Sequence, residues 1–102
     1  MIIYRRTQQV HMDKLDEAMK IATEQAKIFK ELTGKDELVS FQIGGNPRTI
    51  CRQRMVAIDK LGDDDSKVSA DPRWQELEKQ HKGVFVDGTM QDEMRYVINM
   101  PE

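Results

Sequence analysis

Two side chains with potential chemistry lie in the segment DPRWQELEKQHKG, residues 71–83. The segment holds the only tryptophan of the chain, Trp74, and one of its two histidines, His81. With Leu77 between them, they follow the three- and four-residue spacing of one helix face. A histidine with an ordinary pKa of about 6.5 can act as an acid or a base near neutral pH. We expect Trp74 either to anchor a helix in the core or to form a cleft wall, with His81 at its edge as the candidate catalytic residue.

Polar side chains also alternate along the first segment, where Tyr4, Arg6 and Gln8 share one face of a predicted strand. An arginine on a partly covered strand can bind a carboxylate or an enolate through two parallel N–H bonds. It can also stabilise charge that develops during a reaction. The alternatives are that Arg6 is solvated or that it pairs with an acid of a second subunit. Tyr96, on the last predicted strand, could face the same cleft or lie in the core.

The other reactive residues match no binding or catalytic pattern. Arg48, Arg52 and Arg54 lie near a Gly-Gly turn. That turn lacks the spacing and the Lys-Ser/Thr pair of a P-loop, so we expect surface or interface arginines. Three further features are the acidic run 63–65, His11 and Cys51. The acidic run lacks the ligand alternation of a calcium loop, and His11 lacks a second metal ligand. Cys51 lacks a neighbour that would activate it. No metal site is predicted, and Cys51 is expected to be a small buried residue.

Composition limits the class of protein. The 102 residues suit one domain, and 33% charged with 38% apolar residues are typical of a folded, charged domain. The net charge of −2, with both signs interspersed, gives no basic surface for nucleic acid. The single cysteine excludes an intrachain disulfide. Because no apolar run approaches the roughly 20 residues of a membrane span, we expect no membrane association, and a cytoplasmic location is the default.

The elements that would position these residues begin with a strand over 2–10 and a long helix over 14–33. The helix has one apolar stripe at three- and four-residue steps. Asp13 is its predicted N-cap, and Gly34 suits the left-handed residue after its end.

Six further segments follow. Strands over 38–43 and 50–58 flank the turn Gly44-Gly45-Asn46-Pro47 and predict an antiparallel hairpin. The polar segment 60–70 is predicted to be a loop with at most a short helical turn. Asp71 as N-cap and Pro72 at the first helical position open a second helix that ends near Gly83. A loop over 84–90 leads to a last strand over 93–99.

The order β-α-β-β-α-β predicts an α+β, ferredoxin-like fold with an antiparallel four-stranded sheet of order 4-1-3-2. Both helices then lie on one face. The other face lacks a cover within the chain, although strand three, Leu38 and Val97 place apolar residues there. An uncovered apolar face predicts a partner, and the simplest is a second copy that packs sheet to sheet about a two-fold axis.

The opening IIYRRTQQVHMDKLDEAMKIA resembles that of NIPSNAP domains, with Arg6-Thr7 on a strand and the helix start Lys14-Leu15-Asp16-Glu17. The closing MQDEMRYVINMP is also similar to the last strand of such domains. The whole chain resembles the dimeric α/β-barrel superfamily, which includes antibiotic-biosynthesis-monooxygenase-like domains. The resemblance implies a homodimer with an eight-stranded barrel and a cleft between helices and sheet in each subunit.

Members of this superfamily include cofactor-free monooxygenases, haem-degrading monooxygenases and isomerases. Haem-degrading relatives use an Asn on the first strand with a Trp and a His near the second helix. Here Arg6 stands at the best-matching strand position, and the spacing from Trp74 to His81 is shorter than theirs. We therefore expect no cofactor.

Two functional hypotheses remain open. The first is a small-molecule-binding homodimer, with a cofactor-independent monooxygenase or isomerase activity as the implied chemistry. Arg6 would bind an anion, Tyr4 and Tyr96 would orient the ligand, and Trp74 and His81 would form a wall. The second is a non-enzymatic dimerisation or accessory module with a filled core, which predicts no cavity near the roughly 300 Å³ of a small-molecule site.

Overall fold

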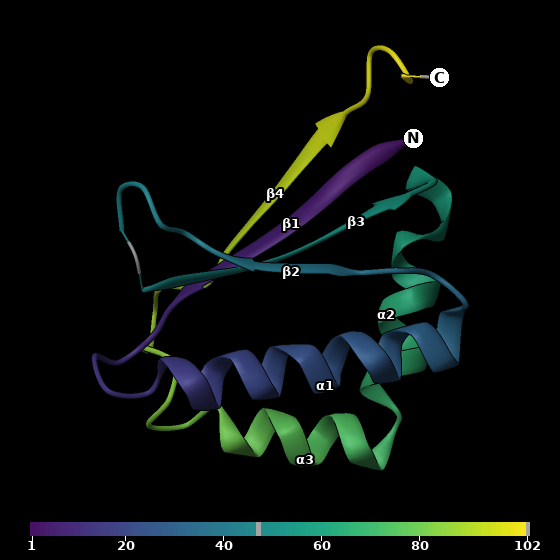
Figure 1. Cartoon of the computed structure of the whole chain (residues 1–102). Helices are drawn as coiled ribbons and strands as arrows, with labels where there is room; N and C mark the ends of the chain where they lie inside the picture. Colours follow the sequence, from purple (N-terminus) through teal and green to yellow (C-terminus); the bar gives the residue numbers. More distant parts are fainter. Residues whose placement is uncertain (47, 102) are drawn as a thin grey trace.

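The computed structural model describes residues 1–46 and 48–101. Its four strands form one antiparallel sheet of order β2-β3-β1-β4, which is the predicted order read from the opposite edge (Figure 1). The strands are β1 (Ile2–Gln9), β2 (Leu38–Phe41), β3 (Thr49–Val56) and β4 (Gln91–Tyr96). The helices α1 (Leu15–Thr33), α2 (Leu61–Ser69) and α3 (Pro72–Gln80) all lie on one side of the sheet (Figure 1). The α+β, ferredoxin-like prediction is confirmed.

Helix α1 begins at Leu15, one residue later than predicted. Lys14, not Asp13, is the N-cap, and no side chain bonds to the free N–H groups there. The backbone explains the shift, because the amide of Lys14 donates to the carbonyl of His11 in a preceding turn, at 3.0 Å. At the other end, Gly34 has a φ of 74° and donates its N–H to the carbonyl of Lys30, as predicted.

The segment predicted to be a polar loop over 60–70 instead forms α2, after a short 3₁₀ turn at Ile58–Lys60. Tertiary contacts favour the helix over a solvated loop. Asp64 is 3% exposed and forms an ion pair with Lys35 at 2.7 Å. Val68 is buried in an apolar cluster that includes residues of α1 and α3. The acidic residues Asp63 and Asp64 also lie in the first turn, where the helix dipole favours negative charge.

Helix α3 begins as predicted. The carboxylate of Asp71 accepts the backbone N–H of Arg73 at 2.8 Å, and Pro72 occupies the first turn. The helix ends at Gln80 with His81 as its C-cap, before the predicted stop at Gly83.

The strands are also slightly shorter or shifted. Strand β4 covers 91–96 rather than 93–99, because within the described part of the chain it pairs with β1 alone and the last pair of that ladder joins Tyr96 to Ile2. The hairpin turn is confirmed by the bond from the amide of Gln42 to the carbonyl of Thr49, at 2.9 Å. Gly45 supplies a φ of 91° there. Pro47 lies outside the described residues.

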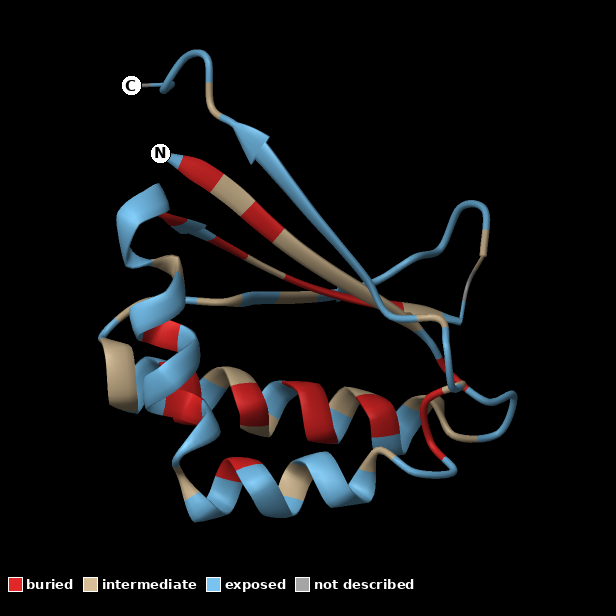
Figure 2. Ribbon diagram, turned by 180° about the vertical axis from the view of Figure 1, so that it is seen from behind, coloured by how far each residue is buried: buried red, intermediate tan, exposed pale blue. Residues whose placement is uncertain are grey.

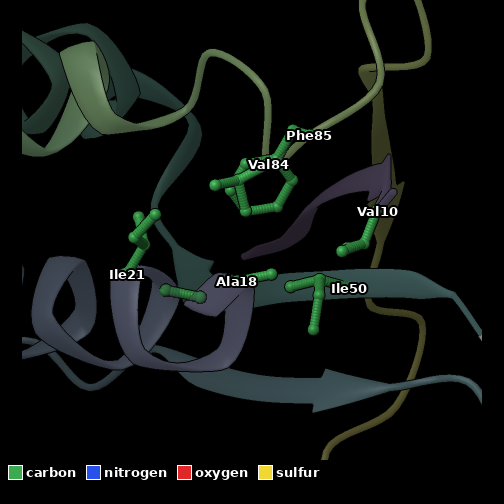
Figure 3. Close-up of a cluster of buried hydrophobic side chains, with 7 residues drawn as sticks. Val10, Ala18, Ile21, Ile50, Val84 and Phe85 are labelled. Carbon is green, nitrogen blue, oxygen red and sulfur yellow. The ribbon is translucent and has the colours of Figure 1, made fainter. Parts of the chain in front are cut away.

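The two faces of the sheet differ in cover. The register places Tyr4 opposite Arg54 and Arg6 opposite Arg52, on the face that the helices cover. Buried residues gather on this side, on α1 and on the adjoining strands (Figure 2). One buried cluster joins α1, β3 and the segment after α3: Val10, Ala18, Ile21, Ala22, Ile50, Val84 and Phe85 (Figure 3).

The uncovered face is apolar at one end only. Ile3 lies opposite Met55, and Leu38 lies on the neighbouring strand. The next positions along the same face carry Arg5 and Gln53, which lie opposite each other. The expectation of a broadly apolar second face is therefore reduced to an apolar patch, which we define as Ile3, Leu38 and Met55.

Candidate functional site

Three of the predicted ligand-binding residues meet at one enclosed cavity on the helix side of the sheet. Tyr4 and Arg6 reach it from β1, and Trp74 reaches it from α3. The cavity has a volume of about 30 Å³. Its other lining residues are Phe29, Glu37, Arg52, Arg54, Asp65 and Val68. Strand alternation and the helix face therefore place these three side chains together, across nearly seventy residues of sequence.

Arg6 already binds a carboxylate of its own chain. Its Nε and one terminal nitrogen donate to the two oxygens of Asp92, at 2.7 and 2.9 Å. Asp92 lies directly opposite Arg6 on β4, so the pairing follows from the register. Arg6 lowers the pKa of Asp92, and the bond to Asp92 is the largest cause of the raised pKa of Arg6. Arg6 thus forms its ion pair within the subunit, whereas the alternatives to ligand binding were a solvated side chain or a pair with a second subunit.

Tyr4 belongs to the same network. Its hydroxyl accepts a 3.1 Å bond from Arg6. The pKa of Tyr4 is raised, first by burial and then by its proximity to Asp92. The phenol is therefore uncharged near neutral pH and keeps its proton for a hydrogen bond.

Arg52 and Arg54 form the part of the site that the sequence-based interpretation missed. Both were expected at the surface or in an interface, yet they are only 8% and 7% exposed. Both pair with Glu37, whose two oxygens lie 3.1 Å from Arg52 and 3.3 Å from Arg54. Arg54 also reaches the exposed Asp65 at 3.0 Å. The pattern did contain a clue, because both arginines alternate in phase with the apolar residues of β3. The third hairpin arginine is exposed, as expected.

Aromatic rings surround these two cations. The guanidinium carbon of Arg54 lies 4.7 Å from the ring centre of Tyr4 and 4.6 Å from that of Phe29. Arg52 lies 5.3 Å from the ring centre of Trp74. Such contacts offset part of the cost of burying a positive charge. Trp74 therefore fulfils both expected roles, because it packs in the core and also lines the cavity.

His81 lies beside the cavity and is not part of its lining. Its ring packs on Phe85 with a centroid separation of 4.6 Å, and its Nε2 is buried without a hydrogen-bond partner among the described residues. Burial, followed by the positive charges of Arg52 and Arg6, lowers the pKa of His81 to about 4. The imidazole is therefore neutral at pH 7 and can accept a proton.

Tyr96 does not join the cavity lining. It lies opposite Ile2 on the helix side of the sheet and is 71% exposed, so it is not a core residue either. Cys51 is buried, as expected, and His11 is exposed.

Within residues 1–46 and 48–101, no three His, Cys, Asp or Glu side chains come together in a way that could hold a metal ion. A helix long and apolar enough to cross a membrane is likewise not found in this part of the chain.

Comparison with known proteins gives matches of structure only. No protein-family model matches the sequence, and no curated protein is similar to it. An uncharacterised NIPSNAP domain protein from Burkholderia xenovorans superposes with a TM-score of 0.82 over 100% of both chains, at 15% identity. A NIPSNAP family protein from Agrobacterium tumefaciens gives a TM-score of 0.76 at 14% identity, over 93% of this chain and 90% of that one.

A third structure, provisionally assigned as an antibiotic biosynthesis monooxygenase from Deinococcus radiodurans, gives a TM-score of 0.73. It is 15% identical and covers 100% of this chain and 97% of its own. The predicted resemblance to NIPSNAP-type and monooxygenase-type domains is thus confirmed at the level of the fold.

Proposed function

We propose that this chain forms a homodimer that binds a small molecule on the helix side of each sheet. The observation that carries the proposal is the convergence of Tyr4, Arg6 and Trp74 on one enclosed, charged cavity. Ligand sites commonly combine a mainly apolar or aromatic wall with a few polar groups that fix orientation. Here Trp74 supplies the wall, and Arg6 and Tyr4 supply the polar groups. Tyr96 and His81 are not among the residues that line this cavity.

His81 limits the chemistry that this site could perform. Its imidazole is in the base form at neutral pH, so an isomerisation that removes a proton from the ligand is the reaction class it would assist. A base whose conjugate acid has a pKa of about 4 is a weak one. Binding is therefore the firmer part of the proposal, and catalysis by His81 is its extension.

A second candidate function is a non-enzymatic dimerisation module. The observation that favours it is the cavity volume of about 30 Å³, which is roughly a tenth of the smallest usual small-molecule site. In this case the buried charges would be structural. The two candidates agree on the dimer and differ on whether any ligand binds.

A screen of small metabolites, followed by titration of each hit, separates them. We expect at least one hit whose affinity falls about tenfold or more in Arg6→Ala, because a charge-assisted hydrogen bond contributes about 1.5–3 kcal/mol. Arg95→Ala is the matched control, since Arg95 lies opposite Ile3 on the other face of the sheet. A screen without hits would support the dimerisation module instead. So would hits whose affinity is the same in the parent protein and in both variants.

A further inference from the structure

We propose that the cavity beside Arg52 and Arg54 binds the carboxylate group of a small organic acid, with these two arginines rather than Arg6 as the principal donors. The inference deepens the proposed function and rests on it for the location of the ligand. It differs in naming the chemical class of the ligand and the residues that hold it.

Charge balance is the first argument. The guanidinium side chains of Arg52 and Arg54 are 9% and 6% exposed, and the carboxylate of Glu37 that they share is 2% exposed. Two buried cations thus face one buried anion. Asp65 also pairs with Arg54, but its side chain is 60% exposed and water screens it. Among the buried groups alone, the cations therefore exceed the anions by one. The solvent-screened Asp65 offsets this excess only in part, and one bound monoanion would neutralise the remainder.

Hydrogen bonding is the second argument. The Nε of Arg54 is buried and donates to no atom of the described residues. Burying such a donor without a partner is costly, so nearly all buried donors in proteins are bonded. Among the described residues, Arg52 makes a single hydrogen bond, to Glu37. Guanidinium groups present parallel N–H donors that match the two oxygens of a carboxylate.

Arg6 is less suited to this role, although it lines the same cavity. Both oxygens of Asp92 already occupy its fork, and Tyr4 accepts a third bond from it. An incoming anion would have to displace Asp92. Arg52 and Arg54 share Glu37 as an acceptor, and the other terminal nitrogen of Arg54 bonds to Asp65. Among the described residues, Nε of Arg54 and two of the three guanidinium nitrogens of Arg52 keep no partner, so the pair can bind a second carboxylate while it keeps Glu37.

Size is the third argument. A volume of about 30 Å³ holds about one or two water molecules, which restricts a ligand to one small group. Two sources of that group are distinguishable. Free formate is the acid whose size comes nearest to this volume, whereas acetate or a longer acid would place only its carboxylate there and extend outward past the exposed Asp65.

The test is a titration of the purified protein with sodium formate, acetate and hexanoate, against sodium chloride at the same ionic strength. Binding is measured by the melting temperature and by ¹³C-formate NMR. We expect the carboxylates to raise the melting temperature above the chloride curve. Binding of both formate and acetate would indicate a free small acid. A larger rise of the melting temperature with hexanoate than with acetate would indicate a longer acid.

Two variants assign the site. Arg54→Lys keeps the charge but removes Nε and the planar fork, and we expect carboxylate affinity to fall at least tenfold. Glu37→Gln removes the competing anion, and we expect that affinity to rise at least tenfold. Arg95→Lys, on the other face of the sheet, is the control. Glu37→Gln keeps the inference testable where Arg54→Lys does not fold, which circular dichroism reveals.

Identical carboxylate and chloride curves in the parent protein would overturn the inference. So would a carboxylate effect that both variants leave unchanged. The proposed function fails separately, because its own screen includes uncharged compounds and depends on Arg6→Ala. Uncharged hits with no carboxylate binding would therefore sustain the function and refute this ligand class.

Discussion

At the residue scale, the charged groups of the site are held by a few buried contacts within the subunit. Glu37 neutralises one of two buried arginines, and Asp92 occupies Arg6. The pKa of His81 is lowered first by burial and then by the two guanidinium groups near it. This arrangement was only partly predictable. Alternation along one strand placed Tyr4 and Arg6 on one face, as observed.

The sequence-based interpretation placed Arg52 and Arg54 at the surface because arginine is usually exposed. Their alternation with the apolar residues of β3 pointed to the buried face instead. Glu37 was beyond reach of sequence patterns for a different reason. It precedes β2 in a segment without periodicity, and only the tertiary fold brings it to the arginines of the next strand. A buried charge network of this kind is a property of the packed sheet, so local periodicity alone does not reveal its acceptor.

His81 should make stability depend on pH between about 6.5 and about 4. Its folded-state pKa of about 4 lies below the ordinary value of 6.5, so protonation favours the unfolded chain. Its contribution is intact above pH 6.5 and is lost as the pH falls toward 4. Because the ring is partly open to solvent, we expect a loss of only about 1–2 kcal/mol. Urea unfolding at about pH 7 and about pH 4.5 should therefore show a smaller pH effect in His81→Gln than in the parent protein.

His11→Gln is the control for this prediction, because it also removes one histidine but from an exposed turn. It should keep the pH dependence of the parent. The three proteins contain the same carboxylates, so the titration of these groups affects all three alike. Equal pH dependence in His81→Gln and the parent would show that the imidazole is not held neutral by burial.

At the element scale, helix ends that depend on local bonds were predictable from the sequence, whereas a helix that depends on tertiary contacts was not. The stop of α1 at Gly34 and the start of α3 at Asp71 were predictable, since each uses a local backbone or side-chain bond. Helix α2 was not, because its short sequence has few apolar positions and three consecutive aspartates. Its stability depends on the Lys35–Asp64 pair and on the burial of Val68, contacts with elements far away in sequence.

Two glycine substitutions should change stability in opposite directions. Gly34 has a φ of 74°, where an added Cβ meets no atom within 4 Å. Gly34→Ala should therefore destabilise the protein by about 1 kcal/mol through backbone strain alone. Gly62 lies within α2 without a positive φ and also has open space around it. Gly62→Ala should stabilise the protein by up to about 1 kcal/mol through helix propensity.

The free energy of unfolding in urea measures both changes, and the pair forms its own control because each replaces hydrogen by methyl. A loss of stability in both variants would mean that the α2 glycine is needed for packing. Equal stability of Gly34→Ala and the parent would show that the end of α1 relaxes out of the left-handed conformation.

At the scale of the whole molecule, the order of elements was sufficient to predict the fold, because a β-α-β-β-α-β chain with short connections has few ways to form one covered sheet. The character of the other face was harder to predict. Alternation assigns each residue of a strand to a face. It does not give the register between neighbouring strands, which decides whether their apolar residues lie side by side. The register places Ile3 and Met55 opposite each other and confines the apolar patch to one end.

Exposed apolar residues extend beyond this patch. Leu38 is 61% exposed and Met55 is 40% exposed, and the segment after β4 adds Ile98 at 95%. Large exposed apolar areas on a small chain are typical of an interface. A second copy related by a two-fold axis is the partner that the proposed function requires, and it would cover the same patch on both chains.

The double substitution Leu38→Lys with Met55→Lys should therefore convert the proposed homodimer to a monomer. It would place four lysines in a two-fold interface, where burial and like-charge repulsion both oppose association. Sedimentation velocity at micromolar concentration should give twice the chain mass of 11.9 kDa for the parent and a single chain mass for the variant. The control Met12→Lys changes a residue that is 79% exposed and lies before α1, away from the sheet, and should remain dimeric. A parent protein that sediments as one chain would refute the dimer, and a dimeric double variant would move the interface to the segment after β4.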